Sequence, residues 1–388
     1  MSTVGEAVAR RAHGVHAPSG MDRGAWIVWA CFALLTVIVR LDSVPSFENV
    51  FAIYREAGLR WVDGQDLYPA QFRFNYFPPS AVLFAALGWL PFQLGGALWR
   101  IANVALFAFG VWRLSDASNT SHSSARFLIA SVVTVILSDS AARHGQMTLA
   151  MAGFMMAAVA DAERGALWRA AAYAALAVAL KPLAAVLVLL LFAIYPRLSW
   201  RMAIALAVSF LLPFLFQHPD YVWRQWAAVP AMLATRAGQQ YEWQHVFTLF
   251  STLGWTATNV QEAAIRGLSA VFVLFLCWRV RQRAPDMGVA LAVYALATCY
   301  ILLFGSGTER NTYAMMTPVV GLVAATAWDS RNRGLVGLMS GVIAIMLLSN
   351  PLQHAFPHTV LAMAKPIACL ILSGWLVWVA LKPRGDAA

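Results

Sequence analysis

Long apolar stretches separated by short polar connections run through almost the whole chain. The apolar stretches lie near residues 25–40, 79–91, 94–112, 126–138, 146–160, 167–180, 183–195, 202–217, 262–278, 287–304, 313–327, 335–349 and 359–381. A helix needs about 20 apolar residues to cross a bilayer at right angles, and polar flanks complete the shorter stretches. The pattern therefore predicts an all-α polytopic membrane protein with about 12 transmembrane helices.

One polar segment, residues 42–78, is too polar to cross a bilayer and too regular to be a linker. Aromatic and aliphatic side chains recur in it at roughly helical spacing, with Arg55 and Arg60 between them. This spacing predicts an amphipathic helix that lies on the membrane surface within the first outer loop. A later aromatic segment, residues 218–261, is expected to form interfacial helices that cap the bundle.

Basic residues set the expected orientation of the helices. They concentrate in the connections at 113–126, 164–169, 197–201, 279–283, 331–333 and 382–384. Cytoplasmic loops carry an excess of Lys and Arg, so we place these connections and both termini in the cytoplasm. The outer face then carries residues 42–78, 139–145, 181–182, 218–261, 305–312 and 350–358.

This orientation puts a condition on residues 79–112, which must cross the membrane an odd number of times although they contain two apolar stretches. We therefore expect one of the two to be short, re-entrant or packed inside the bundle. The domain organisation that follows is a cytoplasmic tail over 1–24, a single transmembrane domain over 25–381 and a second cytoplasmic tail over 382–388.

Composition narrows the classes of function. Hydrophobic residues make up 60% of the 388 residues and charged residues 12%, against about 25% charged in soluble domains. The net charge of +10 arises mainly at the ends of apolar stretches, so it does not indicate binding of nucleic acid. The four cysteines lie inside apolar stretches without ligand spacing, so we expect no metal site, no cofactor and no disulfide framework.

Ionisable side chains on the outer face are candidates for chemistry, because charge beside hydrocarbon is costly. The candidate acids are Asp42, Glu48 and Glu309, with Asp139 as a further acid, and the candidate cations are Arg143, His144, Lys181 and Arg310. A carboxylate can take the proton of an acceptor hydroxyl while cations hold a leaving phosphate. Other roles stay open, because Lys181 could snorkel to the surface and His144 could cap a helix.

Several short motifs occur in a recognisable order. They are Tyr54-x-x-Ala57, Trp61, Gly64-Gln65-Asp66-Leu67-Tyr68, Tyr76-Phe77-Pro78-Pro79, His144-Gly145-Gln146, Leu180-Lys181-Pro182 and Thr308-Glu309-x-x-Thr312-Tyr313. Each motif alone is weak, but their order and spacing over about residues 25 to 330 resemble glycosyltransferase family 87. That family includes polyprenol-phosphate-mannose-dependent α-mannosyltransferases.

The resemblance implies a GT-C-type helical bundle in a bacterial inner (plasma) membrane, with the active site on the outer face. It implies inverting transfer of a hexose, mannose first, from a polyprenyl-phosphate donor to an envelope glycolipid or polysaccharide. It also implies a substrate-binding role for residues of the first outer loop and for one residue next to the outer loop 139–145. The residues concerned are Tyr54, Trp61, Tyr68, Tyr76 and Gln146.

The sequence departs from the family at the position of the usual catalytic Asp, which is Val50 here. Either a neighbouring acid acts as the catalytic base, or a distant acid does so, or the protein is inactive. We rank Glu48 first, then Glu309, then Asp42.

Two other classes of protein share many of these features. A transporter or flippase for a polyprenyl-linked sugar would more often show an internal repeat or a charged path through the membrane. Neither feature is evident in the sequence, because Lys365 is the one clear cation within an apolar stretch. A non-catalytic partner of an envelope glycosylation system is the second alternative. Only the enzyme predicts a product that depends on a carboxylate.

Overall fold

The computed structural model describes residues 20–40, 49–118, 124–237, 243–357 and 359–382. Every regular element in these ranges is a helix, which confirms the predicted all-α class. In chain order the elements are α2 (Gly20–Ile38), α3 (Val50–Val62), α4 (Pro78–Gly88), α5 (Phe92–Ala117), α6 (Ser124–Arg143), α7 (Thr148–Glu163), α8 (Leu167–Leu180), η1 (Pro182–Ala184), α9 (Ala185–Ile194), α10 (Pro196–Leu211), η2 (Leu212–Leu215), α11 (Pro219–Ala237), α12 (Val246–Thr252), α13 (Asn259–Arg283), α14 (Val289–Phe304), η4 (Arg310–Met316), α15 (Thr317–Asp329), α16 (Arg333–Ala355), η5 (Val360–Met363) and α17 (Ala364–Leu381).

Within the described ranges, 6 helices are long and apolar enough to cross a membrane. They are α5, α6, α13 and α16, together with α10 extended by η2 and α17 extended by η5. Four further apolar helices are shorter, namely α4, α8, η1 with α9, and α14. The protein is thus a multi-pass membrane protein, and the expected total of twelve spans stays a prediction.

The pair of apolar stretches at 79–112 forms one short and one long helix. Helix α4 has 11 residues, about 17 Å, which is too short to cross a bilayer. Helix α5 has 26 residues and is long enough to do so. The short helix of the pair is therefore the first one.

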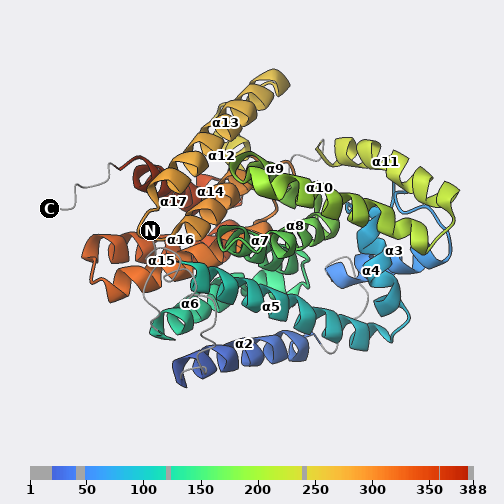
Figure 1. Ribbon diagram of the computed structural model, residues 1–388, viewed down its shortest axis with the longest axis horizontal. Coiled ribbons are helices and arrows are strands. Elements are labelled where there is room, and N and C mark those ends of the chain that lie inside the picture. The colour runs from blue at the N-terminus through green and yellow to red at the C-terminus, as the bar shows by residue number, and fades with distance from the viewer. Residues whose placement is uncertain (1–19, 41–48, 119–123, 238–242, 358, 383–388) are drawn as a thin grey trace, which may run out of the picture.

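Helix α7 lies at the centre of the bundle (Figure 1). Nearly all of its side chains are buried, and most of them are Ala, Met or Gly. The small residues let α5 come very close: a Cβ atom added to Gly153 would lie 2.2 Å from the backbone oxygen of Leu106. One added to Gly110 would lie 2.5 Å from the Cα of Gly153. Small residues at such a crossing are the usual means of bringing two membrane helices together.

The connections predicted to be cytoplasmic contact one another at one end of the bundle. Buried Asp161, near the end of α7, pairs with Arg113 of α5 and, at 3.1 Å, with Arg169 of α8. Arg126 at the start of α6 pairs with Asp329 at the end of α15. Hydrogen bonds at the same end join α13 to α9 and to the end of α17. The basic connections therefore share one end, as the charge pattern predicted.

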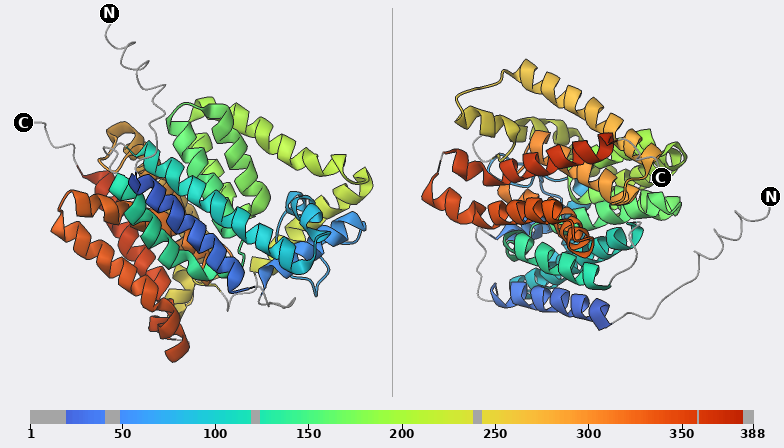
Figure 2. Two further views of the ribbon diagram at one scale, coloured as in Figure 1. Left: turned by 90° about the horizontal axis from the view of Figure 1, so that it is seen from below. Right: turned by 90° about the vertical axis from the view of Figure 1, so that its left-hand side faces the viewer.

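The outer loops meet at the opposite end of the bundle, where α3, α4 and α11 gather (Figures 1 and 2). There Gln225 of α11 accepts a hydrogen bond of 2.9 Å from the backbone of Leu67. The segment 218–261 forms α11, α12 and the start of α13, in agreement with the helices expected in this region. Which of the two ends faces the cytoplasm stays a prediction.

Helix α3 forms where its amphipathic pattern predicted, but its apolar face does not lie on lipid. Phe51, Tyr54 and Trp61 are buried in protein. Helix α4 and the start of α5 cover Phe51 and Tyr54, and α11 covers Trp61. Gly58 makes this packing possible, because a Cβ there would meet the backbone carbonyl carbon of Phe84 at 2.4 Å. The expected position on the membrane surface is therefore wrong for this face of α3.

The contact between α5 and α7 predicts the effect of a single methyl group. We expect Gly153→Ala to destabilise the protein by roughly 1–3 kcal/mol, because the added carbon has no space beside the backbone of Leu106. Thermal unfolding of the detergent-solubilised protein measures the change. Gly374→Ala in α17 is the matched control, since nothing lies within 4 Å of a Cβ at that position. Equal unfolding temperatures for the two variants would contradict the close crossing.

Candidate functional site

Three consecutive residues at the start of α7 connect three of the predicted site residues. The side-chain amide Nε2 of Gln146 donates a hydrogen bond of 3.3 Å to Oε2 of Glu309. The backbone N–H of Met147 donates to the hydroxyl of Tyr54 at 3.2 Å. Thr148 Oγ1 accepts a hydrogen bond of 3.1 Å from Nζ of Lys181. The first turn of α7 therefore gathers an acid, a tyrosine and a lysine from three distant parts of the chain.

Helix α5 fixes the shape of this turn. Asn103 donates its side-chain N–H to the carbonyl oxygen of Gln146 and accepts from the backbone N–H of Ala150, each at 2.8 Å. Trp99 Nε1 donates to the carbonyl oxygen of Gly145 at 2.8 Å. Gly145 has a φ of +67°, which explains a glycine at this point of the turn. Buried polar groups that are satisfied in this way hold a single geometry.

The aromatic residues predicted for substrate binding lie below the surface of the site. The hydroxyls of Tyr54 and Tyr76 are 3.1 Å apart and both rings are buried. Tyr68 donates its hydroxyl hydrogen to the carbonyl oxygen of Tyr76 at 2.8 Å and is half-buried. Trp61 is buried against Tyr221 of α11. Burial, and then the neighbouring Tyr76, raises the pKa of Tyr54, so its hydroxyl stays protonated.

Lys181 is buried and is the residue that joins the end of α8 to the start of η1. Its backbone is extended, with φ −147° and ψ 125°, which is the conformation that a following proline favours. The break in the helix turns the side chain onto the start of α7 rather than out to lipid. Lys181 therefore lies on the same side of the bundle as Gln146 and Glu309.

Glu309 and Arg310 are half-buried at the start of η4. Burial lowers the pKa of Arg310, and no acid in the described ranges forms an ion pair with it. Nζ of Lys365, at the start of α17, donates to the carbonyl oxygen of Arg310 at 3.1 Å and is itself buried. Lys365 thus adds an amine to this end of the bundle, beside Arg310.

Arg143 and His144 lie beside the same turn but are held locally. Arg143 pairs with Asp139, one turn earlier on α6, and both side chains are partly exposed. His144 donates from Nδ1 to the carbonyl oxygen of Ser140 at 2.7 Å, which leaves Nε2 as the nitrogen that can face a ligand. Ser140 in turn donates to Asn311 of η4 at 2.9 Å, so the end of α6 also contacts the Glu309 loop.

Two of the three candidate bases, Asp42 and Glu48, lie outside the described residues. Asn49, which follows Glu48, is described, and its Oδ1 accepts a hydrogen bond of 3.1 Å from Arg100 of α5. The chain therefore enters α3 close to the turn that α5 holds. Among the described residues, no group of three or more His, Cys, Asp or Glu could hold a metal ion.

Sequence reasoning missed Asn103 and Thr148 as parts of this site. Asn103 could have been noticed because it is a polar residue within the apolar stretch of α5. Thr148 gave no signal of its own. Its role depends on the neighbour that α8 brings to it, and hydrophobic periodicity does not encode that neighbour.

A family model described as glycosyltransferase family 87 matches residues 74–306. The match covers more than half of the 388 residues. The chain belongs to glycosyltransferase family 87. The matched range of this family 87 chain includes Tyr76, Arg143, His144, Gln146 and Lys181, whereas Glu309 lies three residues beyond its end.

Two solved structures are similar to this family 87 chain. The crystal structure of ArnT from Cupriavidus metallidurans bound to undecaprenyl phosphate has 17% sequence identity and a TM-score of 0.43, and the similarity covers 92% of this chain and 77% of that chain. The apo structure of the same protein has 16% identity and a TM-score of 0.42, with 92% and 76% covered. No curated protein matches the chain.

Gln244, in the segment just before α12, forms hydrogen bonds on both sides of Glu309 and so holds the loop that carries it. The backbone N–H of Gln244 donates to the carbonyl oxygen of Thr308 at 2.7 Å, and Tyr313 donates its hydroxyl hydrogen to the carbonyl oxygen of Gln244 at 2.8 Å. The next residue, His245, caps α12 by accepting the backbone N–H of Thr248 at Nδ1, 3.2 Å away. A protonated imidazole could not accept this bond.

This cap predicts a loss of stability in acid. Burial, and then the cation of Arg266, lowers the pKa of His245 to about 4 in the folded protein, below its unfolded value of about 6.5. A lowered pKa gives stability that is full above the unfolded value and is lost as pH falls towards the folded value. We expect the unfolding temperature to fall by several degrees between pH 7 and pH 4.5.

The matched variant is His245→Asn, which keeps a capping acceptor but does not titrate in this range. Its unfolding temperature is expected to change less over the same interval. If wild type and variant lose stability in parallel, His245 is not the group that titrates.

Proposed function

We propose that this family 87 protein transfers a hexose, mannose first, from a polyprenyl-phosphate donor to an envelope glycolipid or polysaccharide, with inversion at the anomeric carbon. The observation that carries the proposal is the first turn of α7, which contacts both Glu309 and Lys181. It brings an acid and a cation together at the polar end of a membrane-embedded bundle.

The cations suit the leaving group of such a transfer. As the acceptor oxygen forms its bond to the anomeric carbon, the bond from that carbon to the phosphate oxygen breaks and charge grows on the phosphate. Lys181 is positioned to hold this charge, and the positive end of the α7 dipole adds to it. His144 Nε2 and Arg310 are the further donors that we assign to the phosphate.

The lengths of the helices suit a donor with a lipid tail. Helices α7, α8 and α14 have 16, 14 and 16 residues, or about 24, 21 and 24 Å. The hydrocarbon core of a bilayer is about 30 Å thick. We therefore place the helix ends near Gln146, Lys181 and Glu309 within the thickness of the membrane. A phosphate that travels in the lipid can reach them there.

The acceptor must lose a proton to a carboxylate on the face opposite the leaving phosphate. Glu48 is the first candidate, because it directly precedes Asn49 and α3. Glu309 is the rival, since Gln146 holds its side chain beside the site. Asp42 is third. Glu56 is less suitable because it is paired with Arg60 at 2.8 Å.

A transfer assay with membranes, a polyprenyl-phosphate sugar and a membrane extract as acceptor tests the proposal. We expect Glu48→Gln to lower the rate by about 10²–10⁴, the usual cost of a lost general base, with expression and donor binding unchanged. Glu56→Gln is the matched control and is expected to keep its rate.

The other outcomes reassign or remove the role of the carboxylate. Normal turnover by Glu48→Gln together with an inactive Glu309→Gln would make Glu309 the base. Normal turnover by both variants and by Asp42→Asn would contradict the carboxylate mechanism. A wild-type protein that gives no product with any donor would favour a flippase or a non-catalytic partner.

A further inference from the structure

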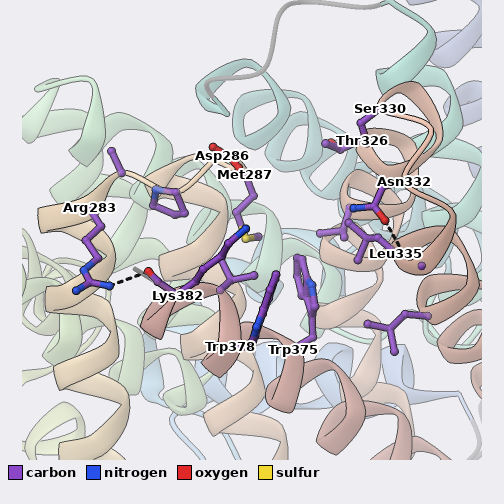
Figure 3. A pocket seen from close by; sticks show the side chains of 16 residues that line it. Arg283, Asp286, Met287, Thr326, Ser330, Asn332, Leu335, Trp375, Trp378 and Lys382 are labelled. Atoms are coloured by element: carbon purple, nitrogen blue, oxygen red, sulfur yellow. Dashed lines mark hydrogen bonds between the residues drawn. The ribbon is translucent and has the colours of Figure 1, made fainter. Parts of the chain in front are cut away.

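A cavity of about 780 Å³ opens at the end of the bundle where α13 and α17 finish and α15 turns into α16 (Figure 3). Charged and polar groups line it together with two tryptophans and several aliphatic side chains. Its main polar residues are Arg283, Asp286, Thr326, Ser330, Asn332 and Lys382. Trp375, Trp378, Val323, Leu335, Leu338 and Val379 supply most of the apolar surface.

This cavity is separate from the candidate glycosyltransfer site. Helix α14 starts next to Met287, which lines the cavity, and ends at the loop that carries Glu309. Helix α17 starts beside Arg310, where Lys365 bonds, and ends at Lys382. With 16 residues in α14, the two places are about 24 Å apart along the bundle.

The charges in the cavity favour an anionic ligand. Lys382 is exposed, and its Nζ lies 5.1 Å from the ring centre of Trp378. Arg283 donates Nη1 to the carbonyl oxygens of Leu381 at 3.1 Å and Lys382 at 2.7 Å, which holds the guanidinium at the C-terminal end of α17. Within the described ranges neither cation forms an ion pair. Asp286 is the one acid among the lining residues, so the lining carries a net positive charge.

The surroundings favour a ligand at the edge of a membrane. Tryptophan is enriched where hydrocarbon meets the head groups of the lipids, and Trp378 is 57% exposed at the cavity. Arg283, Asn332 and Lys382, each from one of the basic connections predicted to be cytoplasmic, line it. The excess of Lys and Arg predicts that this is the cytoplasmic end. Anionic lipids are concentrated on that side of the membrane, and basic pockets between helices bind them.

We propose that this cavity binds the phosphodiester head group of one anionic phospholipid of the cytoplasmic leaflet. Lys382 and Arg283 contact the phosphate, and the side-chain amide of Asn332 and the hydroxyls of Thr326 and Ser330 bond the polar remainder of the head group. The acyl chains leave past Trp378 and the apolar residues towards the lipid. The site is independent of glycosyl transfer at the other end.

Native mass spectrometry of the full-length protein in detergent tests the proposal. The purified protein is titrated separately with phosphatidylglycerol, phosphatidylethanolamine, polyprenyl phosphate and inorganic phosphate. We expect one phosphatidylglycerol to bind more tightly than phosphatidylethanolamine, and Lys382→Gln to weaken it about fivefold. Arg283→Gln is expected to weaken it similarly. Arg279→Gln is the matched control, because Arg279 lies one turn earlier on α13 and does not line the cavity.

Several results would overturn the assignment. They are equal binding of the anionic and the zwitterionic phospholipid, unchanged binding by Lys382→Gln and Arg283→Gln, or equal weakening by Arg279→Gln. Displacement of phosphatidylglycerol by inorganic phosphate would make the cavity a site for free phosphate. Weaker binding of polyprenyl phosphate to Lys382→Gln than to the wild type would assign it to the donor lipid. Unfolding temperatures of the variants confirm that each one is folded before binding is compared.

Discussion

The close approach of α5 and α7 is the contact on which the rest of the structure depends. Gly110 and Gly153 leave no room for a Cβ atom between the two backbones, so the helices meet through main-chain atoms rather than side chains. Trp99, Asn103 and Gly110 lie four and seven residues apart and so share one face of α5. That face supplies the hydrogen bonds to the carbonyl oxygens of Gly145 and Gln146. A packing contact in the core therefore fixes a buried polar turn at the end of the bundle.

The fixed turn organises the outer end of the molecule. It presents an amide to Glu309, a backbone N–H to Tyr54 and a hydroxyl to Lys181, and each of these belongs to a different segment of the chain. The buried Tyr54 and Tyr76 make the first loop part of the protein core rather than a cover on the membrane. Groups held in this way need little reorganisation when charge develops on a substrate, which is what electrostatic catalysis requires.

Hydrophobic runs and basic connections were sufficient to predict an all-helical bundle and to sort its loops between two ends. They did not predict where the apolar face of α3 lies, because an amphipathic pattern says only that this face avoids water. Gly58, inside the pattern, was the available signal, since a glycine at that position permits the approach of Phe84.

The predicted alternation of membrane crossings also placed Gln146, Lys181 and Glu309 at one end of the bundle. Their actual contacts depend on which helices are neighbours, and periodicity does not contain that information. The stretch with Asp42 and Glu48 lies outside the described residues, so the identity of the base still depends on the sequence.

The most direct test of this account is the position of the donor phosphate, determined by cryo-electron microscopy of the full-length protein with a polyprenyl phosphate. We expect phosphate density within hydrogen-bond distance of Lys181 Nζ, beside the first turn of α7. We also expect Lys181→Met to remove this density and to leave the fold unchanged. Density elsewhere, at the Arg283 and Lys382 end for example, with the surroundings of Lys181 fully packed by protein, would contradict it.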